Sequence, residues 1–309
     1  MRRLFIDTDT GSDDAVALVM ALRTAGVRVE GISTVAGNVD LSQATRNALT
    51  TVELCGAAVP VYAGVAAPLL RPHRDARDVH GPDGLGGMNY PAPSRRPESR
   101  HGVDALTETI MAMPGELTLV TLGPLTNVAV ALTRTPELAG AVREIVMMGG
   151  AHTRVGNVDT SPSAEYNIWG DPEAARIVFR SGAPITMVGI ELCRGEAVVN
   201  ADDQRRIRAI GTPYANFVLD INGFLQQAVA RYGIQGIDMP DPVAMAVAID
   251  RAVLLEEGRY YVDIETTGEL TLGETVVDFY GVTGRVPNAS VGLRLDAARF
   301  KSMLESALR

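Results

Sequence analysis

The chain contains very little lysine, cysteine or tryptophan. Only Lys301 is lysine among 28 basic residues, and there are two cysteines, Cys55 and Cys193, and one tryptophan. The position of Lys301 in the C-terminal tail excludes a catalytic lysine in the main body of the fold. The spacing of the two cysteines fits neither a metal knuckle nor a disulfide framework. Unpaired thiols are typical of a reducing compartment, so we expect a cytoplasmic protein.

Positive charge is also scarce, and no apolar run is long. The 28 basic and 37 acidic residues give a formal net charge of −9. Nucleic acids and anionic membranes need a positive binding surface, so we expect neither as a partner. No apolar segment is long enough for a signal peptide or a membrane span. The hydrophobic content of 46% indicates a globular core, and the acidic balance fits a metal or a small neutral or cationic ligand.

Short apolar runs alternate with helix-like stretches along the chain. The predicted strands are 4–7, 27–35, 59–63, 117–122, 144–148 and 184–189, and the predicted helices are 13–24, 41–55, 124–133, 172–181 and 243–250. This alternation predicts an α/β fold with a mostly parallel, Rossmann-like central sheet and helices on both faces. We expect a single domain over 1–309, with a long loop at about 71–100 and a β-rich stretch over 260–282.

The most informative segment is Asp7-Thr8-Asp9-Thr10-Gly11-Ser12-Asp13-Asp14, directly after the first predicted strand. Ligands bind beyond the carboxyl ends of parallel strands, which is where this segment lies. One or two aspartates at a helix start are ordinary caps, but four would repel one another unless a cation neutralises them. Oxygen-only ligands favour Ca²⁺ or Mg²⁺. Neighbouring helical residues point about 100° apart, so one of Asp13 and Asp14 can bind the metal while the other faces a water held by it.

These residues resemble the N-terminal signature of the inosine–uridine-preferring nucleoside hydrolases. Five further blocks occur in the family's order along the chain. They are Thr34-Val35-Ala36-Gly37-Asn38, Leu122-Gly123-Pro124-Leu125-Thr126-Asn127, Met147-Met148-Gly149-Gly150, Ala164-Glu165-Tyr166-Asn167 with the following Asp171-Pro172-Glu173-Ala174-Ala175, and Asp241-Pro242. Each block alone is only moderately specific, whereas the ordered set identifies the chain as resembling that family over most of its length.

The resemblance implies calcium-dependent hydrolysis of the N-glycosidic bond of ribonucleosides to base and ribose. It assigns Ca²⁺ to Asp9, Asp14, the backbone carbonyl of Leu122 and Asp241. It places Asp7 behind these ligands, and makes Asp13 the general base for the attacking water. The residues implied to contact the substrate are Asn38, His80, Met148, Asn157, Glu165, Asn167 and Tyr232. The family also implies a homodimer or homotetramer.

The chain departs from the family before its last metal aspartate. Many members have His-Asp-Pro there, and the histidine is thought to protonate the departing base, whereas this chain reads Met239-Pro240-Asp241-Pro242. Proline has no proton to donate. His80 or Tyr232 could take that role, or the enzyme could favour a base that leaves without help, so the sequence predicts no nucleobase preference.

Two alternatives remain from the sequence. A haloacid-dehalogenase-type phosphatase would use Asp7 as nucleophile with Mg²⁺, but it also needs a lysine in the body of the chain to hold the phosphate. A catalytically weak nucleoside- or ribose-binding homologue would explain the proline at position 240.

Overall fold

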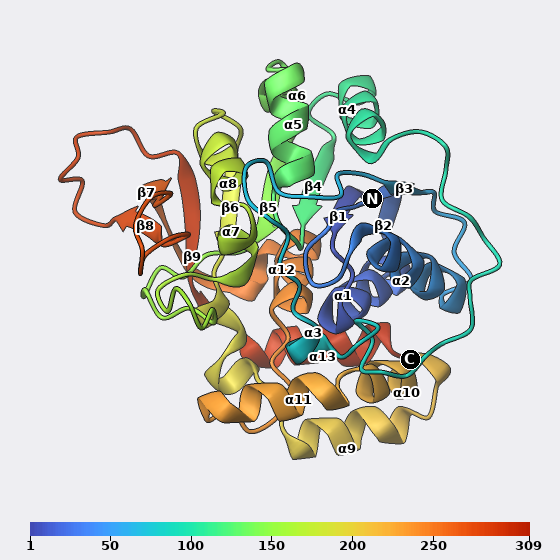
Figure 1. The fold of residues 1–309 in the computed structure, drawn as a ribbon. Coiled ribbons are helices and arrows are strands. Elements are labelled where there is room, and N and C mark those ends of the chain that lie inside the picture. The colour runs from blue at the N-terminus through green and yellow to red at the C-terminus, as the bar shows by residue number, and fades with distance from the viewer.

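The computed structural model describes all of residues 1–309, and one nine-stranded sheet runs through it (Figure 1). The strand order is β3-β2-β1-β4-β5-β6-β9-β7-β8. Neighbouring strands from β3 to β9 are parallel, whereas β7 runs antiparallel to both β9 and β8. The mostly parallel sheet is therefore confirmed. The strands are β1 (Arg2–Thr8), β2 (Val27–Thr34), β3 (Val61–Ala63), β4 (Leu117–Thr121), β5 (Glu144–Met148), β6 (Ile185–Val188), β7 (Leu254–Ile264), β8 (Thr275–Asp278) and β9 (Ala289–Leu295).

Helices cover both faces of this sheet within a single domain, as the sequence predicts. They are α1 (Ser12–Arg23), α2 (Leu41–Leu54), α3 (Arg77–His80), α4 (Gly102–Ala112), α5 (Thr126–Arg134), α6 (Leu138–Ala141), α7 (Tyr166–Gly170), α8 (Pro172–Phe179), α9 (Ala201–Ile210), α10 (Pro213–Ile221), α11 (Gly223–Val229), α12 (Pro240–Ile249) and α13 (Ala297–Ala307). Side chains alternate across a strand, so Leu4 and Ile6 of β1 pack with α1, α2, α10, α12 and α13, while Phe5 packs with α4, α5 and α8.

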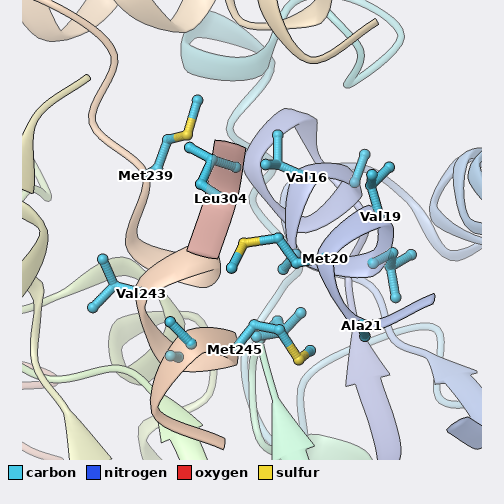
Figure 2. Close-up of a cluster of buried hydrophobic side chains, with 14 of the residues drawn as sticks. Val16, Val19, Met20, Ala21, Met239, Val243, Met245 and Leu304 are labelled. Atoms are coloured by element: carbon cyan, nitrogen blue, oxygen red, sulfur yellow. The ribbon is translucent and has the colours of Figure 1, made fainter. Parts of the chain in front are cut away.

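Helix α1 lies in the middle of the larger of the two cores. Its residues from Ser12 to Ala21 are all buried, because the sheet lies on one side and other helices enclose the rest. Figure 2 shows Val16 and Met20 of α1 among Val243 of α12 and Leu304 of α13. A helix packed on all sides holds its N-terminal side chains firmly in place. Asp13 and Asp14 are therefore presented from a rigid element.

Several element boundaries differ from the predicted ones by a few residues. Helix α12 begins at Pro240 rather than at 243, because prolines are tolerated in a first turn whose N–H groups need no helical partner. The predicted long loop contains the one-turn helix α3. Helices α4, α9, α10, α11 and α13 were not predicted, and the β-rich stretch begins earlier, with β7 at Leu254.

No helix has both the length and the apolar character that crossing a bilayer requires. Cys55 and Cys193 are both free thiols, as their spacing predicts.

Candidate active site

The carboxyl ends of the central strands open into a pocket lined by 21 residues, whose space of about 770 Å³ includes open solvent. Ten of the residues singled out from the sequence line it. They are Asp13, Asn38, His80, Leu122, Met148, Asn157, Glu165, Asn167, Tyr232 and Asp241. Asp7, Asp9 and Asp14 do not line the pocket and are completely buried behind it. The structure therefore gathers the predicted residues in one region, in two layers.

Three carboxylates from two helices converge at the pocket wall. One oxygen each from Asp13, Asp14 and Asp241 lies within 4.8 Å of the others, and all three side chains are buried. Asp13 and Asp14 come from the first turn of α1, and Asp241 from the first turn of α12. Three negative charges at this separation oppose one another in a buried site, so the arrangement favours a positive ion between them.

Asp14 and Asp9 are held by a network of hydrogen bonds. Thr8 Oγ1, Gly11 N and Asn38 Nδ2 donate to Asp14 at 2.5, 2.8 and 3.1 Å. The backbone N of Asn38 donates to Asp9 Oδ2 at 2.6 Å. Asn38 therefore joins the two carboxylates through its backbone and side chain, in addition to lining the pocket.

Asp13 is held much more loosely than its neighbour. Its Oδ1 atom is buried, has no hydrogen-bond partner, and lies 3.6 Å from His80 Nδ1. Burial, with the adjacent charge of Asp14, raises the pKa of Asp13 to about 8. His80 Nδ1 accepts a hydrogen bond from the backbone N of Ser12 at 3.3 Å, which fixes the ring. Asp13 thus keeps an oxygen available to a ligand.

The residues present fit a hard divalent cation. Asp9 Oδ1 and Asp13 Oδ1 are both buried without partners, which is costly unless something positive satisfies them. Burial, together with the neighbouring aspartates, also holds the pKa values of Asp9 and Asp241 well above their usual range. The available ligands are carboxylates and the nearby carbonyl of Leu122, an all-oxygen set of the kind that Ca²⁺ and Mg²⁺ prefer. The cluster could therefore bind a metal.

Two glycines leave room for Asp9. A Cβ atom at Gly37, after β2, would lie 2.0 Å from Asp9 Oδ2, and one at Gly123, after β4, would lie 2.6 Å from Asp9 Oδ1. Any side chain at either position would displace the carboxylate. This close approach gives a physical reason for glycine in both sequence blocks.

Asp7 supports the site from behind. Its Oδ1 accepts hydrogen bonds from Ser33 Oγ and, at 2.7 Å, from Asn127 Nδ2. Burial raises the pKa of Asp7 to about 7. These contacts link β1 to β2 and to α5, so Asp7 ties together the strands whose ends form the pocket.

Glu165 and Asn167 form a second polar group on the wall. Glu165 caps α7 by accepting from Asn167 N at 2.9 Å and Ile168 N at 3.3 Å, and it also accepts from Gly150 N at 2.9 Å. Burial raises the pKa of Glu165 to about 7. Asn167 Nδ2 donates to the carbonyl of Leu122 at 2.7 Å. The Met148 side chain is buried beside them, with its Sδ 3.2 Å from Asn167 Nδ2. The predicted residues of this group are therefore neighbours in space.

Asn157 and Tyr232 meet at the outer part of the pocket. Asn157 Oδ1 accepts from Tyr166 N at 2.9 Å, which orients its amide. The Tyr232 hydroxyl donates to Asp159 Oδ1 at 3.2 Å, and the side chain is exposed. Trp169 lies beside Tyr166 with ring centroids 6.2 Å apart and does not line the pocket, which agrees with a packing role.

Several pocket residues were missed in the sequence. Tyr166 lies inside a recognised block, but nothing in the pattern marked it. Arg194 and Asp238 carry no motif, although Asp238 precedes Asp241 by only three positions. The missed apolar lining residues come from the α3 region, from the segment after β6 and from the segment around α11: Ala76, Val79, Ile190, Leu225, Ala228, Val229 and Ile234.

The single lysine does not take part in this site. Lys301 Nζ binds Asp203 Oδ2 at 2.7 Å, and neither residue lines the pocket. No lysine is therefore available to hold a phosphate beside Asp7, and the phosphatase alternative has no support.

Comparisons with known proteins agree with this geometry. The family model of the inosine–uridine-preferring nucleoside hydrolases matches residues 4–302. A pyrimidine-specific ribonucleoside hydrolase of Escherichia coli is 36% identical over all of this chain and 97% of its own. A solved plant nucleoside hydrolase is 33% identical with a TM-score of 0.92, covering 99% of this chain and 98% of its own. A purine-preferring ribonucleoside hydrolase from Gardnerella vaginalis is 31% identical with a TM-score of 0.91, with the same coverage. The chain therefore belongs to the inosine–uridine-preferring nucleoside hydrolase family and is a nucleoside hydrolase.

Proposed function

We propose that this enzyme hydrolyses the N-glycosidic bond of ribonucleosides to free base and ribose, with Asp13 as the general base and Ca²⁺ as the metal. Asp9, Asp14, the carbonyl oxygen of Leu122 and Asp241 would hold the ion. The observation that carries the proposal is the buried meeting of Asp13, Asp14 and Asp241 at the wall of a pocket that also gathers the predicted sugar-binding residues. Bound calcium would supply positive charge that anchors the sugar hydroxyls and polarises a water molecule.

Asp13 is suited to remove the proton from that water. Its Oδ1 has no protein donor, whereas Asp14 accepts three hydrogen bonds. A general base needs a free lone pair within reach of the proton that it takes. The difference in bonding therefore favours Asp13 as base and Asp14 as ligand, although the two are adjacent in the chain.

The remaining polar wall suits a ribosyl group that becomes positively charged. Positive charge develops on the sugar as a glycosidic bond breaks, and fixed negative groups stabilise it. Glu165 supplies a buried carboxyl, and the amides of Asn38, Asn157 and Asn167 supply donors and acceptors for hydroxyl groups. We infer that these four residues hold the ribose, and that Met148, His80 and Tyr232 complete the enclosure.

Relatives of similar identity have names with opposite base preferences. The Escherichia coli protein is named for pyrimidines and the Gardnerella vaginalis protein for purines. Our proposal is therefore made for ribonucleosides as a class. Assembly as a homodimer or homotetramer and location in the cytoplasm both stay predictions.

A reducing-sugar assay on inosine, uridine, cytidine, adenosine and guanosine tests the proposal. We expect release of ribose from at least one nucleoside, loss of that release in EDTA, and recovery on adding Ca²⁺. Full activity in chelator, with no metal found by elemental measurement, would contradict the metal site. Tight nucleoside binding without ribose release would instead favour the binding-protein alternative.

A further inference from the structure

The proposed reaction needs an acid at the base end of the pocket. When the glycosidic bond breaks, its electron pair stays on a ring nitrogen of the base, and a poor leaving group needs a proton at that moment. Pro240 lines the pocket next to Asp241, but it has neither an N–H group nor an acidic side chain. For a base that is a poor leaving group, another pocket residue must supply the proton.

Asp238 is a buried carboxyl on the pocket wall. Its side chain lines the pocket, the residue is 5% exposed, and its Oδ1 atom has no hydrogen-bond partner. A buried carboxyl oxygen without a partner is unusual in a folded protein and calls for a ligand or a functional role. The Cys193 thiol lies next to this carboxyl, but it donates its hydrogen bond to the carbonyl of Ile190 at 2.9 Å.

The backbone around Asp238 is fixed on both sides. On one side, Ile237 exchanges two backbone hydrogen bonds with Val199, each 3.0 Å long. On the other side, Met239 caps α12, and its carbonyl accepts from Val243 N. Asp238 therefore projects from a short rigid connection, as a positioned proton donor requires.

Burial brings the pKa of the Asp238 carboxyl closer to neutral pH. Burial raises the pKa of Asp238 to about 6, although the Cys193 thiol and the charge of Arg194 oppose that rise. Asp238 in turn contributes to the raised pKa of Asp13, so the two carboxyls are close enough to interact. This arrangement resembles other glycoside hydrolysis, in which one carboxyl donates a proton and another accepts one.

His80 and Tyr232, the two candidates that the sequence offered, are poorer proton donors than Asp238. His80 accepts from Ser12 N through Nδ1, and burial lowers its pKa to about 4, so the ring is neutral and can only offer a hydrogen bond. Tyr232 is exposed, its hydroxyl is engaged with Asp159, and burial raises its pKa above the ordinary value. A carboxylic acid is the stronger donor.

We propose that Asp238 protonates the departing nucleobase. The inference rests on the proposed function and adds the second proton transfer to it. The C1′–N bond breaks with its electron pair going to the base, Asp238 gives its proton to the base, water adds its oxygen to C1′, and Asp13 takes the proton of that water. Return of one proton from Asp13 to Asp238 through solvent restores both carboxyls, so the sum is nucleoside plus water giving base plus ribose.

The test compares two leaving groups in the variant Asp238→Asn. Asparagine keeps the shape but has no acidic proton. We expect hydrolysis of a good ribonucleoside substrate to fall by at least roughly a hundredfold in kcat, the usual scale for losing a general acid. Hydrolysis of p-nitrophenyl β-ribofuranoside should change by less than about threefold, because p-nitrophenolate leaves without protonation.

Glu191→Gln is the matched control, because Glu191 is a largely buried carboxylate near this wall but does not line the pocket. Both substrates should respond to this control to the same extent. Equal losses on both substrates in Asp238→Asn would show a structural role, an unchanged kcat on nucleosides would exclude the acid role, and a rise in KM alone would make Asp238 a binding contact. Each of these results overturns the inference. If the unmodified enzyme cleaves neither substrate, the proposed function itself fails, so the two failures are distinguishable.

Discussion

At the scale of single residues, the two neighbouring aspartates of α1 differ in their contacts, and the roles that we propose for them rest on that difference. Asp13 and Asp14 share one helical turn and nearly identical burial, yet Asp14 accepts three hydrogen bonds and Asp13 Oδ1 accepts none. The free oxygen is the property that a proton acceptor needs. Their roles therefore follow from which donors surround each side chain.

We expect Asp13→Asn to lower turnover by at least roughly a hundredfold, because the amide cannot take a proton from water. Calcium affinity, measured by titration calorimetry, should fall much less than turnover does. Asp202→Asn, on the exposed surface of α9, is the control and should keep normal turnover. Near-normal turnover in the Asp13 variant would assign the base to another residue.

The site residues that follow the strands could be predicted from the sequence, whereas Asp238 and Arg194 of the pocket wall could not. Asp9, Asp13 and Asp14 follow a buried strand in a dense acidic pattern that few other roles explain. Asp238 and Arg194 reach the same pocket through tertiary packing of segments without a motif. Hydrophobic periodicity and motif spacing in the sequence do not reveal such contacts, so these residues could be found only from the three-dimensional structure.

At the scale of elements, the loops after β2 and β4 are shaped around one carboxylate. Both loops place a glycine against Asp9, at distances that exclude a Cβ atom. The sheet brings these loops together because β2 and β4 flank β1 in parallel register. The glycines in the two loops and the order of the strands therefore both make room for Asp9.

We expect Gly37→Ala to weaken calcium binding by roughly tenfold or more, which corresponds to about 1.4 kcal/mol. The new methyl group would push Asp9 away from its position. Gly140→Ala is the matched control, since a Cβ there meets nothing within 4 Å, and its calcium affinity should be unchanged. Equal calcium affinity in both variants, measured by calorimetry, would remove Asp9 from the ligand set.

The strands of the sheet could be predicted from the sequence better than helices α9, α10 and α11 could. The strands and their flanking helices show regular apolar periods, so all six predicted strands exist and each boundary is close to the observed one. Helices α9, α10 and α11 follow one another along the chain and make little contact with the sheet. No strand lies between them to mark where one helix ends and the next begins. Their placement depends on packing against α1 and α3.

At the scale of the whole molecule, the buried carboxyls of the site contribute to the pH dependence of stability. Without calcium, the folded protein holds protons on Asp7 and Asp13, whose pKa values are about 7 and about 8, while the unfolded chain releases them near pH 4. The folded state then binds more protons than the unfolded state, so stability falls as pH rises from about 4 to about 8. A bound cation replaces these protons.

We therefore expect calcium to raise the Tm more at pH 8 than at pH 6, because fewer protons compete with it at the higher pH. In EDTA, the Tm should fall over the same interval. Differential scanning calorimetry at several pH values, with and without calcium, measures both effects. A calcium-induced rise that is larger at pH 6 than at pH 8 would contradict the assignment of these carboxyls to the site.

The complete burial of α1 has a consequence for how such enzymes can diverge. The aspartates to which we assign the chemistry belong to a helix whose other residues hold the centre of the molecule together, so most changes there would cost folding as well as catalysis. Part of the apolar lining comes from α11, which lies in the outer helical layer (Figure 1), where substitutions are more easily tolerated. Substitutions in α11 can therefore change the pocket lining while the aspartates of α1 stay the same. Such divergence fits relatives that are named for different nucleosides.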